Sequence, residues 1–148
     1  LNGTALAQAP EAYLRQVFWM DPRSDALDAL TVRAWLQTLP AQHAAWDAAA
    51  LAAHVQGWGL EEHLDKGFYM LSTGSKRKVL MAAALASGAP LTLIDEPVAG
   101  LDHGSVRYLC QALAATSAAQ PGRALVVAHY EPLAGVPWRA VIELPDLG

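Results

Sequence analysis

Two carboxylates follow directly after a short apolar run, and this placement points to phosphoryl or metal chemistry. Residues 91–94, Leu-Thr-Leu-Ile, are typical of a short buried parallel strand. Asp95 and Glu96 come next, at the strand end where α/β sheets keep their reactive groups. Asp95 is suited to hold a magnesium ion, and Glu96 to orient a water molecule for attack on a phosphoryl group. Taken alone, the pair is better explained as a loop cap and a solvated charge.

A loop of small residues precedes the helix that leads to this strand. It consists of Ser72, Thr73, Gly74 and Ser75. The sequence predicts a helix over residues 75–87, which Gly88 ends. Unpaired N–H groups and the helix dipole favour a phosphate at such a helix start, and the basic residues 76–78 add positive charge. The alternative is an ordinary serine N-cap followed by a solvated basic face.

The elements that must position these residues alternate between strand and helix. We expect a strand at residues 16–20, helical segments at 31–40 and 41–56, a helix at 103–119, and strands at 124–128 and 139–143. Such alternation predicts an α/β fold with a parallel sheet covered by helices. His129 follows the strand at 124–128 and can reach the same crevice, although a lone histidine after a strand is more often structural.

Composition limits the class of protein. A chain of 148 residues with 53% hydrophobic and 16% charged residues is typical of one globular domain. The net charge of −4 gives no electrostatic reason to expect a nucleic-acid partner. Cys110 is the only cysteine, so an internal disulfide is impossible and we expect a reducing compartment. The sequence lacks a run of eighteen apolar residues that would span a bilayer.

The order and spacing of these motifs resemble the ATP-binding cassette (ABC) ATPase family over nearly the whole chain. Residues 71–75 are similar to the family's signature loop, and residues 91–96 to its Walker B strand. Residues 99–102 resemble the D-loop, and His129 stands where the family has its switch histidine. Thr31-Val32 is similar to the pair that opens the family's helical subdomain.

The resemblance implies a fold and a division of the chain. The fold would be the parallel sheet core of a P-loop NTPase, here partial, with an inserted all-α helical subdomain. Residues 1–148 would form the C-terminal three-quarters of one nucleotide-binding domain, with the helical subdomain at 24–72 and the Walker B and switch-histidine part of the core at 73–148. The Walker A motif, Gly-x-x-x-x-Gly-Lys-Ser/Thr, does not occur in this sequence. We expect it upstream of Leu1 in a longer protein, and we expect no ATPase activity from the 148 residues alone.

The resemblance also implies roles for single residues, with ATP and Mg²⁺ as cofactors. Asp95 would serve the metal, Glu96 would be the general base, and His129 would contact the γ-phosphate. Asp102 would link the two sites of a head-to-tail dimer. Four residues would bind the nucleotide in trans, across that dimer: Ser72, Thr73, Gly74 and Ser75.

The expected partners are a second ABC ATPase domain and a transmembrane permease. The protein would then lie at the cytoplasmic face of the bacterial inner membrane as a peripheral subunit that hydrolyses ATP to power transport. The alternative is a degenerate or soluble cassette protein, which acts as a nucleotide-dependent dimerisation switch without transport.

Three positions depart from the family's pattern. Thr73 replaces the first signature glycine and Ser75 replaces the glutamine. In the Q-loop region, Met20 and Asp21 stand where a glutamine is expected. A carboxylate beside a γ-phosphate repels it unless a metal intervenes. We therefore expect weakened coupling or hydrolysis, but not an inactive site, because Glu96 and His129 are retained.

Overall fold

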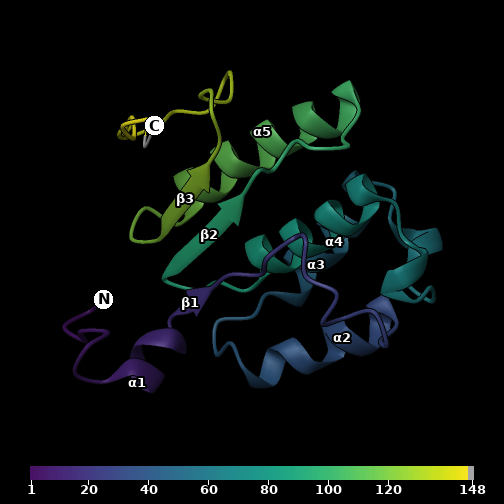
Figure 1. Ribbon diagram of the computed structural model, residues 1–148, viewed down its shortest axis with the longest axis horizontal. Coiled ribbons are helices and arrows are strands. Elements are labelled where there is room, and N and C mark those ends of the chain that lie inside the picture. Colours follow the sequence, from purple (N-terminus) through teal and green to yellow (C-terminus); the bar gives the residue numbers. More distant parts are fainter. Residues whose placement is uncertain (147–148) are drawn as a thin grey trace.

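A three-stranded parallel sheet organises the chain (Figure 1). The computed structural model describes residues 1–146. The strands are β1 (Val17–Phe18), β2 (Leu91–Asp95) and β3 (Ala124–Ala128), in the spatial order β1-β2-β3. Leu91 pairs with Val17 on one side and Ala124 on the other. Because all three strands run in the same direction, their carboxyl ends lie along one edge of the sheet.

Helix α4 (Thr73–Ala86) forms the centre of the hydrophobic core. Its start is set by Ser72, whose Oγ accepts a hydrogen bond from the N–H of Ser75 at 3.1 Å. Its end is set by Gly88, which adopts a φ of +63° that side chains disfavour. Residues 79–86 of the helix are all buried, and α4 contacts both β2 and α3 (Ala48–Gly57). The predicted helix over residues 75–87 is confirmed to within two residues.

Side-chain caps also set the starts of most other helices. Helix α5 (His103–Ala119) begins after Asp102, which caps it, and matches the predicted range of 103–119. Helix α1 (Pro10–Leu14) is a short segment before β1. Helix α2 (Val32–Thr38) begins after Thr31, whose hydroxyl accepts from the N–H of Ala34 at 3.1 Å. None of the helices between residues 1 and 146 is long and apolar enough to cross a membrane.

Short helical pieces connect α2 to α4 through the segment that we expected to be all helical. They are the 3₁₀ turns η1 (Leu39–Ala41), η2 (Glu61–His63) and η3 (Phe68–Met70). The helix predicted over residues 41–56 starts only at Ala48. Asp47 caps that start through the N–H of Ala50, and its own N–H donates to the carbonyl of Ala86 at 2.8 Å. This long-range bond fixes Asp47 as the last non-helical residue before α3.

The strand predicted over residues 139–143 is wrong. In the described part of the chain β3 pairs only with β2, and residues 139–143 form no ladder with any strand. A strand needs a neighbour to satisfy its backbone groups, and this segment has none. Val141 and Ile142 are accordingly exposed. The strand predicted over residues 16–20 is confirmed as β1 in a shorter form.

Candidate functional site

The predicted site residues that follow strands meet at one edge of the sheet. Met20 and Asp21 come after β1, Asp95 and Glu96 stand at the end of β2, and His129 follows β3. Because β2 lies between its two neighbours, its acidic pair occupies the middle of this edge. The sheet thus brings together residues that lie more than 100 positions apart in sequence.

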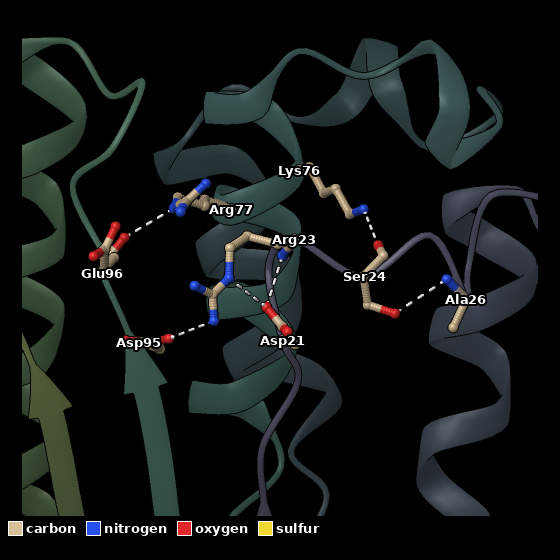
Figure 2. A network of polar contacts seen from close by, with 8 residues as sticks. All are labelled: Asp21, Arg23, Ser24, Ala26, Lys76, Arg77, Asp95 and Glu96. Atoms are coloured by element: carbon tan, nitrogen blue, oxygen red, sulfur yellow. Dashed lines mark hydrogen bonds and ion pairs between the residues drawn. The ribbon is translucent and has the colours of Figure 1, made fainter.

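Asp95 faces a cation supplied by the loop after β1. Its Oδ2 lies 3.6 Å from Nη2 of Arg23, and about a third of its side chain is exposed. Figure 2 shows the Arg23 guanidinium between Asp95 and Asp21. The Asp95 carboxylate therefore faces a solvent-accessible position at which a positive charge is stabilised.

The backbone of Glu96 is held in an unusual conformation. Its φ is +44°, in the left-handed region that residues with a side chain seldom adopt. Its N–H donates to the carbonyl of Ala128 at 2.9 Å, and its own carbonyl accepts from Nε of Arg77 at 2.8 Å (Figure 2). Arg77 is almost fully buried, with 7% of its surface exposed. These bonds stabilise the strained residue and leave its carboxylate exposed to solvent, which is a common arrangement at functional sites.

Arg77 was not among the residues that sequence reasoning selected as functional. The run 76–78 was interpreted as local positive charge, with a solvated basic face as the alternative. That alternative is wrong for Arg77, because it is buried against the acidic pair's backbone. Its distance of nineteen residues from Glu96 in the sequence left no local signal of the contact.

His129 has an unsatisfied nitrogen. Within the described residues its Nδ1 is buried and makes no hydrogen bond, and its ring lies against that of Tyr130 with centroids 4.3 Å apart. A buried polar atom without a partner costs free energy. Its position at the end of β3 is therefore compatible with an additional ligand, as well as with a purely structural role.

The small-residue loop before α4 packs against the segment that follows the acidic pair. Ser72 and Ser75 bond each other, with 3.0 Å between their hydroxyl oxygens. Thr73 is an ordinary first helical residue and has no positive φ, so its side chain imposes no backbone strain. Gly74 is different, because a methyl group added there would lie 2.1 Å from the carbonyl oxygen of Gly100. This glycine thus permits close packing of the α4 start on residues 99–102.

Asp102 is the N-cap of α5. Its Oδ1 accepts a hydrogen bond from the N–H of Ser105 at 2.7 Å. This bond, with the further hydrogen bond from the Ser105 side chain, holds the pKa of the Asp102 carboxyl below its usual range. Its capping role accounts for the local geometry, and a contact with another subunit remains a prediction.

Asp21 is paired, which its sequence position did not reveal. Its Oδ1 accepts from the N–H of Arg23 at 2.9 Å and from its Nε at 3.1 Å. The backbone bond, followed by the side-chain bond, lowers the pKa of Asp21. Arg23 was missed in the sequence because it belongs to no motif; the only available signal was an opposite charge two residues from Asp21.

The donor set fits a magnesium ion that is shared with a phosphate ligand. Magnesium commonly takes one or two protein carboxylates and completes its shell with phosphates and waters. Asp95 supplies one accessible carboxylate that already faces a cation. Among residues 1–146 there is no group of three acidic, histidine or cysteine ligands. Residues 1–146 alone therefore do not form a complete metal cage.

Comparisons with known proteins show which family the chain resembles in sequence and structure. The family model described as ABC transporter matches residues 3–99. A cytochrome c biogenesis ATP-binding export protein, CcmA, of Paramagnetospirillum magneticum is 34% identical over 122 residues, which are 80% of this chain and 56% of that protein. The CcmA protein of Novosphingobium aromaticivorans is 42% identical over 91 residues, which are 60% of this chain and 46% of that protein.

A solved structure titled as the ATP binding subunit of an ABC transporter matches with a TM-score of 0.73 and 27% identity, covering 88% of this chain and 55% of that one. The chain thus spans about half the length of the curated relatives described above. The matched residues 3–99 include the loop at 72–75 and the acidic pair, and they make up more than half of the sequence. The chain belongs to the ABC transporter family.

Proposed function

We propose that this chain is part of an ATP-binding and ATP-hydrolysing subunit of a bacterial membrane transporter. The observation that carries the proposal is the acidic pair at the end of the central strand, flanked by Asp21 and His129 at the same edge, in a chain of the ABC transporter family. The phosphate-binding Walker A loop lies, in this proposal, outside the 148 residues. Residues 1–148 are then the C-terminal part of one nucleotide-binding domain.

Each residue of the edge has a distinct task in this proposal. Asp95 holds the magnesium ion of bound ATP, which neutralises charge on the phosphates. Glu96 accepts a proton from the attacking water, and its exposed carboxylate on a fixed backbone suits that role. His129 contacts the terminal phosphate through its ring, whose Nδ1 has no partner within residues 1–146.

The loop before α4 serves a second nucleotide, across a dimer. Ser72 and Ser75 bond each other rather than the acidic pair, which supports separate tasks for the two groups. Asp102 lies at the adjoining loop and connects the two sites. Residues 24–72 form the helical subdomain that faces a transmembrane permease, and residues 73–148 belong to the core. In this proposal the protein lies at the cytoplasmic face of the inner membrane as a peripheral subunit.

Replacing Glu96 with Gln tests the catalytic assignment. In the full-length protein, Glu96→Gln should lower ATP turnover by about a hundredfold or more, because the general base is lost. Binding of Mg²⁺-ATP should persist, since the amide keeps the shape of the side chain. Glu62→Gln, at an exposed position of η2, is the matched control. Equal turnover in the Glu96→Gln variant and the unmodified protein would refute the assignment.

The position of the loop across a dimer has its own test. A non-hydrolysing Glu96→Gln protein should dimerise on addition of Mg²⁺-ATP, measured by size-exclusion chromatography with light scattering. Adding Ser72→Arg should abolish that dimer while leaving ATP binding to the monomer intact. A nucleotide-dependent dimer that survives Ser72→Arg would contradict binding in trans.

Both CcmA relatives support a narrower form of the proposal, in which the subunit serves an exporter of cytochrome c biogenesis. The test is complementation of a bacterium that lacks its own such ATPase. The full-length protein should restore c-type cytochromes, detected by their haem absorbance, and its Glu96→Gln variant should not. Failure of the unmodified, well-expressed protein would argue against this cargo pathway and leave the ATPase proposal in place.

A further inference from the structure

Three carboxylates gather at the site that we propose for a phosphate ligand. Asp95 and Glu96 end β2, and Asp21 follows β1 on the neighbouring strand. A phosphate group carries further negative charge, and each additional carboxylate near it raises the free energy of binding. The site therefore needs a cation beyond the magnesium ion that Asp95 accounts for.

Arg23 is the cation that faces these carboxylates. Its Nε lies 3.1 Å from Oδ1 of Asp21, and its Nη2 lies 3.6 Å from Oδ2 of Asp95. The charge of Glu96 also raises the pKa of Arg23, after the larger effects of Asp21 and Asp95. The buried Arg77 does not take this role, because it donates to the backbone carbonyl of Glu96 rather than to a carboxylate.

The loop that carries Arg23 is an ordered turn attached to α4. The N–H of Ser24 donates to the carbonyl of Asp21 at 3.1 Å, and Oγ of Ser24 accepts from the N–H of Ala26 at 3.2 Å. The ammonium of Lys76, in the first turns of α4, donates to the carbonyl of Ser24 (Figure 2). These bonds fix the direction from which the Arg23 side chain reaches the site.

The Arg23 side chain remains accessible to a ligand. It is 69% exposed, whereas Asp21 and Asp95 are 33% and 30% exposed. Because the backbone of Arg23 is fixed and its guanidinium is exposed, the side chain can keep its contact with Asp21 while a ligand displaces its longer contact with Asp95. If Asp95 held a magnesium ion, repulsion between the two cations would favour that displacement.

We propose that Arg23 offsets the charge of Asp21, so that a phosphate group can bind beside it. The Asp21–Arg23 pair then replaces a single neutral polar side chain at the end of β1. This inference rests on the proposed function, since it concerns nucleotide binding at the same site. The sequence predicts that the Asp21 carboxylate repels a nearby γ-phosphate. In this inference Arg23 is the counter-ion of Asp21 and reduces that repulsion.

The test measures binding of Mg²⁺ with a non-hydrolysable ATP analogue to the full-length protein by titration calorimetry. Arg23→Gln should weaken binding by about fivefold at low salt, because Asp21 is left uncompensated. The double variant Asp21→Asn, Arg23→Gln should recover binding to within about twofold, since it removes both charges. Arg23→Lys should bind nearly as well as the unmodified protein, because it keeps the charge.

Arg33→Gln is the matched control. Arg33 forms a comparable surface pair with Asp65, with Nε 2.7 Å from Oδ1, outside the site. Its replacement should leave nucleotide affinity unchanged. The fivefold effect of Arg23→Gln should also shrink at high salt, since exposed charges are screened.

Three results would overturn the inference. One is unchanged or tighter binding by Arg23→Gln, which would show that Arg23 competes with magnesium at Asp95. Another is a double variant that binds as weakly as Arg23→Gln, which would show that Arg23 acts by contacting the phosphate directly. The third is weak binding by Arg23→Lys. Absence of binding by the unmodified protein would instead refute the proposed function.

Discussion

Arg123 connects the end of α4 to strand β2, and its replacement should destabilise the fold. Its Nη2 donates to the carbonyl of Ala84 at 2.6 Å and to the hydroxyl of Thr92 at 2.8 Å, and its Nη1 donates to the carbonyl of Leu85 at 2.9 Å. The two carbonyls belong to the last turn of α4, where a cation also favours the helix dipole. Burial lowers the pKa of Arg123 to about 10, which still leaves it charged near neutral pH.

The size of the effect follows from these bonds. A hydrogen bond to a charged group contributes about 1.5–3 kcal/mol, so three give about 4.5–9 kcal/mol. Withdrawal of the guanidinium from water offsets several kcal/mol of that gain. We therefore expect Arg123→Met, which keeps an apolar stem, to lower the free energy of unfolding by about 2–4 kcal/mol. The free energy of unfolding of Arg123→Lys should lie between those of the unmodified protein and Arg123→Met, because an ammonium lacks the planar fork of a guanidinium.

Urea denaturation followed by circular dichroism measures this difference through the midpoint shift and a common slope. The control is Arg33→Met, which breaks the exposed pair with Asp65 and should leave the urea midpoint nearly unchanged, because solvent screens that pair. Equal losses in the two variants would refute the reasoning. A change in the urea dependence of the free energy of unfolding, as well as in the midpoint, would indicate that Arg123→Met alters the denatured state. The loss of stability would then be measured by amide hydrogen exchange in α4.

Two further predictions concern packing and pH. Gly74→Ala should destabilise by about 1–3 kcal/mol, because its methyl group would lie 2.1 Å from the carbonyl oxygen of Gly100. The control is Gly122→Ala, whose added methyl group meets no atom within 4 Å. Equal melting temperatures of the two variants would contradict this prediction. Burial lowers the pKa of His54 from 6.5, so the unfolded chain binds the proton more readily and stability should fall as pH drops below 6.5. His54→Gln should reduce this dependence of stability on pH, measured as the difference between urea midpoints above and below pH 6.5. An unchanged difference would exclude His54 as a cause. Burial also lowers the pKa values of His43 and His63, which account for the remaining pH dependence.

Much of the fold was predictable because local chemistry sets helix ends. Asp102 caps α5 through Ser105, and the helix has the predicted bounds. Thr31 starts α2 in the same manner, and Gly88 ends α4 with a positive φ. The apolar runs that form β2 and β3 were also found. In each case the determining residue lies within four positions of the boundary it sets, so a pattern in the sequence is sufficient.

The candidate site was predictable only in part. The motif residues that follow the three strands lie at one edge of the sheet, since parallel strands carry their carboxyl ends to the same edge. The two basic residues that contact this edge, Arg23 and Arg77, were not selected from the sequence. Arg77 and Arg23 reach Glu96 and Asp95 across long stretches of chain, and no spacing rule links them. The roles of the motif residues toward nucleotide and partner subunit stay predictions.

The sequence by itself determined which segments become helices and strands, through caps, glycines and apolar runs. Only the tertiary structure decided whether a capable segment found a partner. Residues 139–143 have strand composition but lack a neighbour, so their backbone cannot form a ladder within the described chain. Arg123 has a local acceptor in Gln120, yet it also donates to acceptors 31 and 39 residues away in the sequence. Hydrogen-bond acceptors become specific partners only when folding brings them within about 3 Å, and sequence spacing carries no record of that distance.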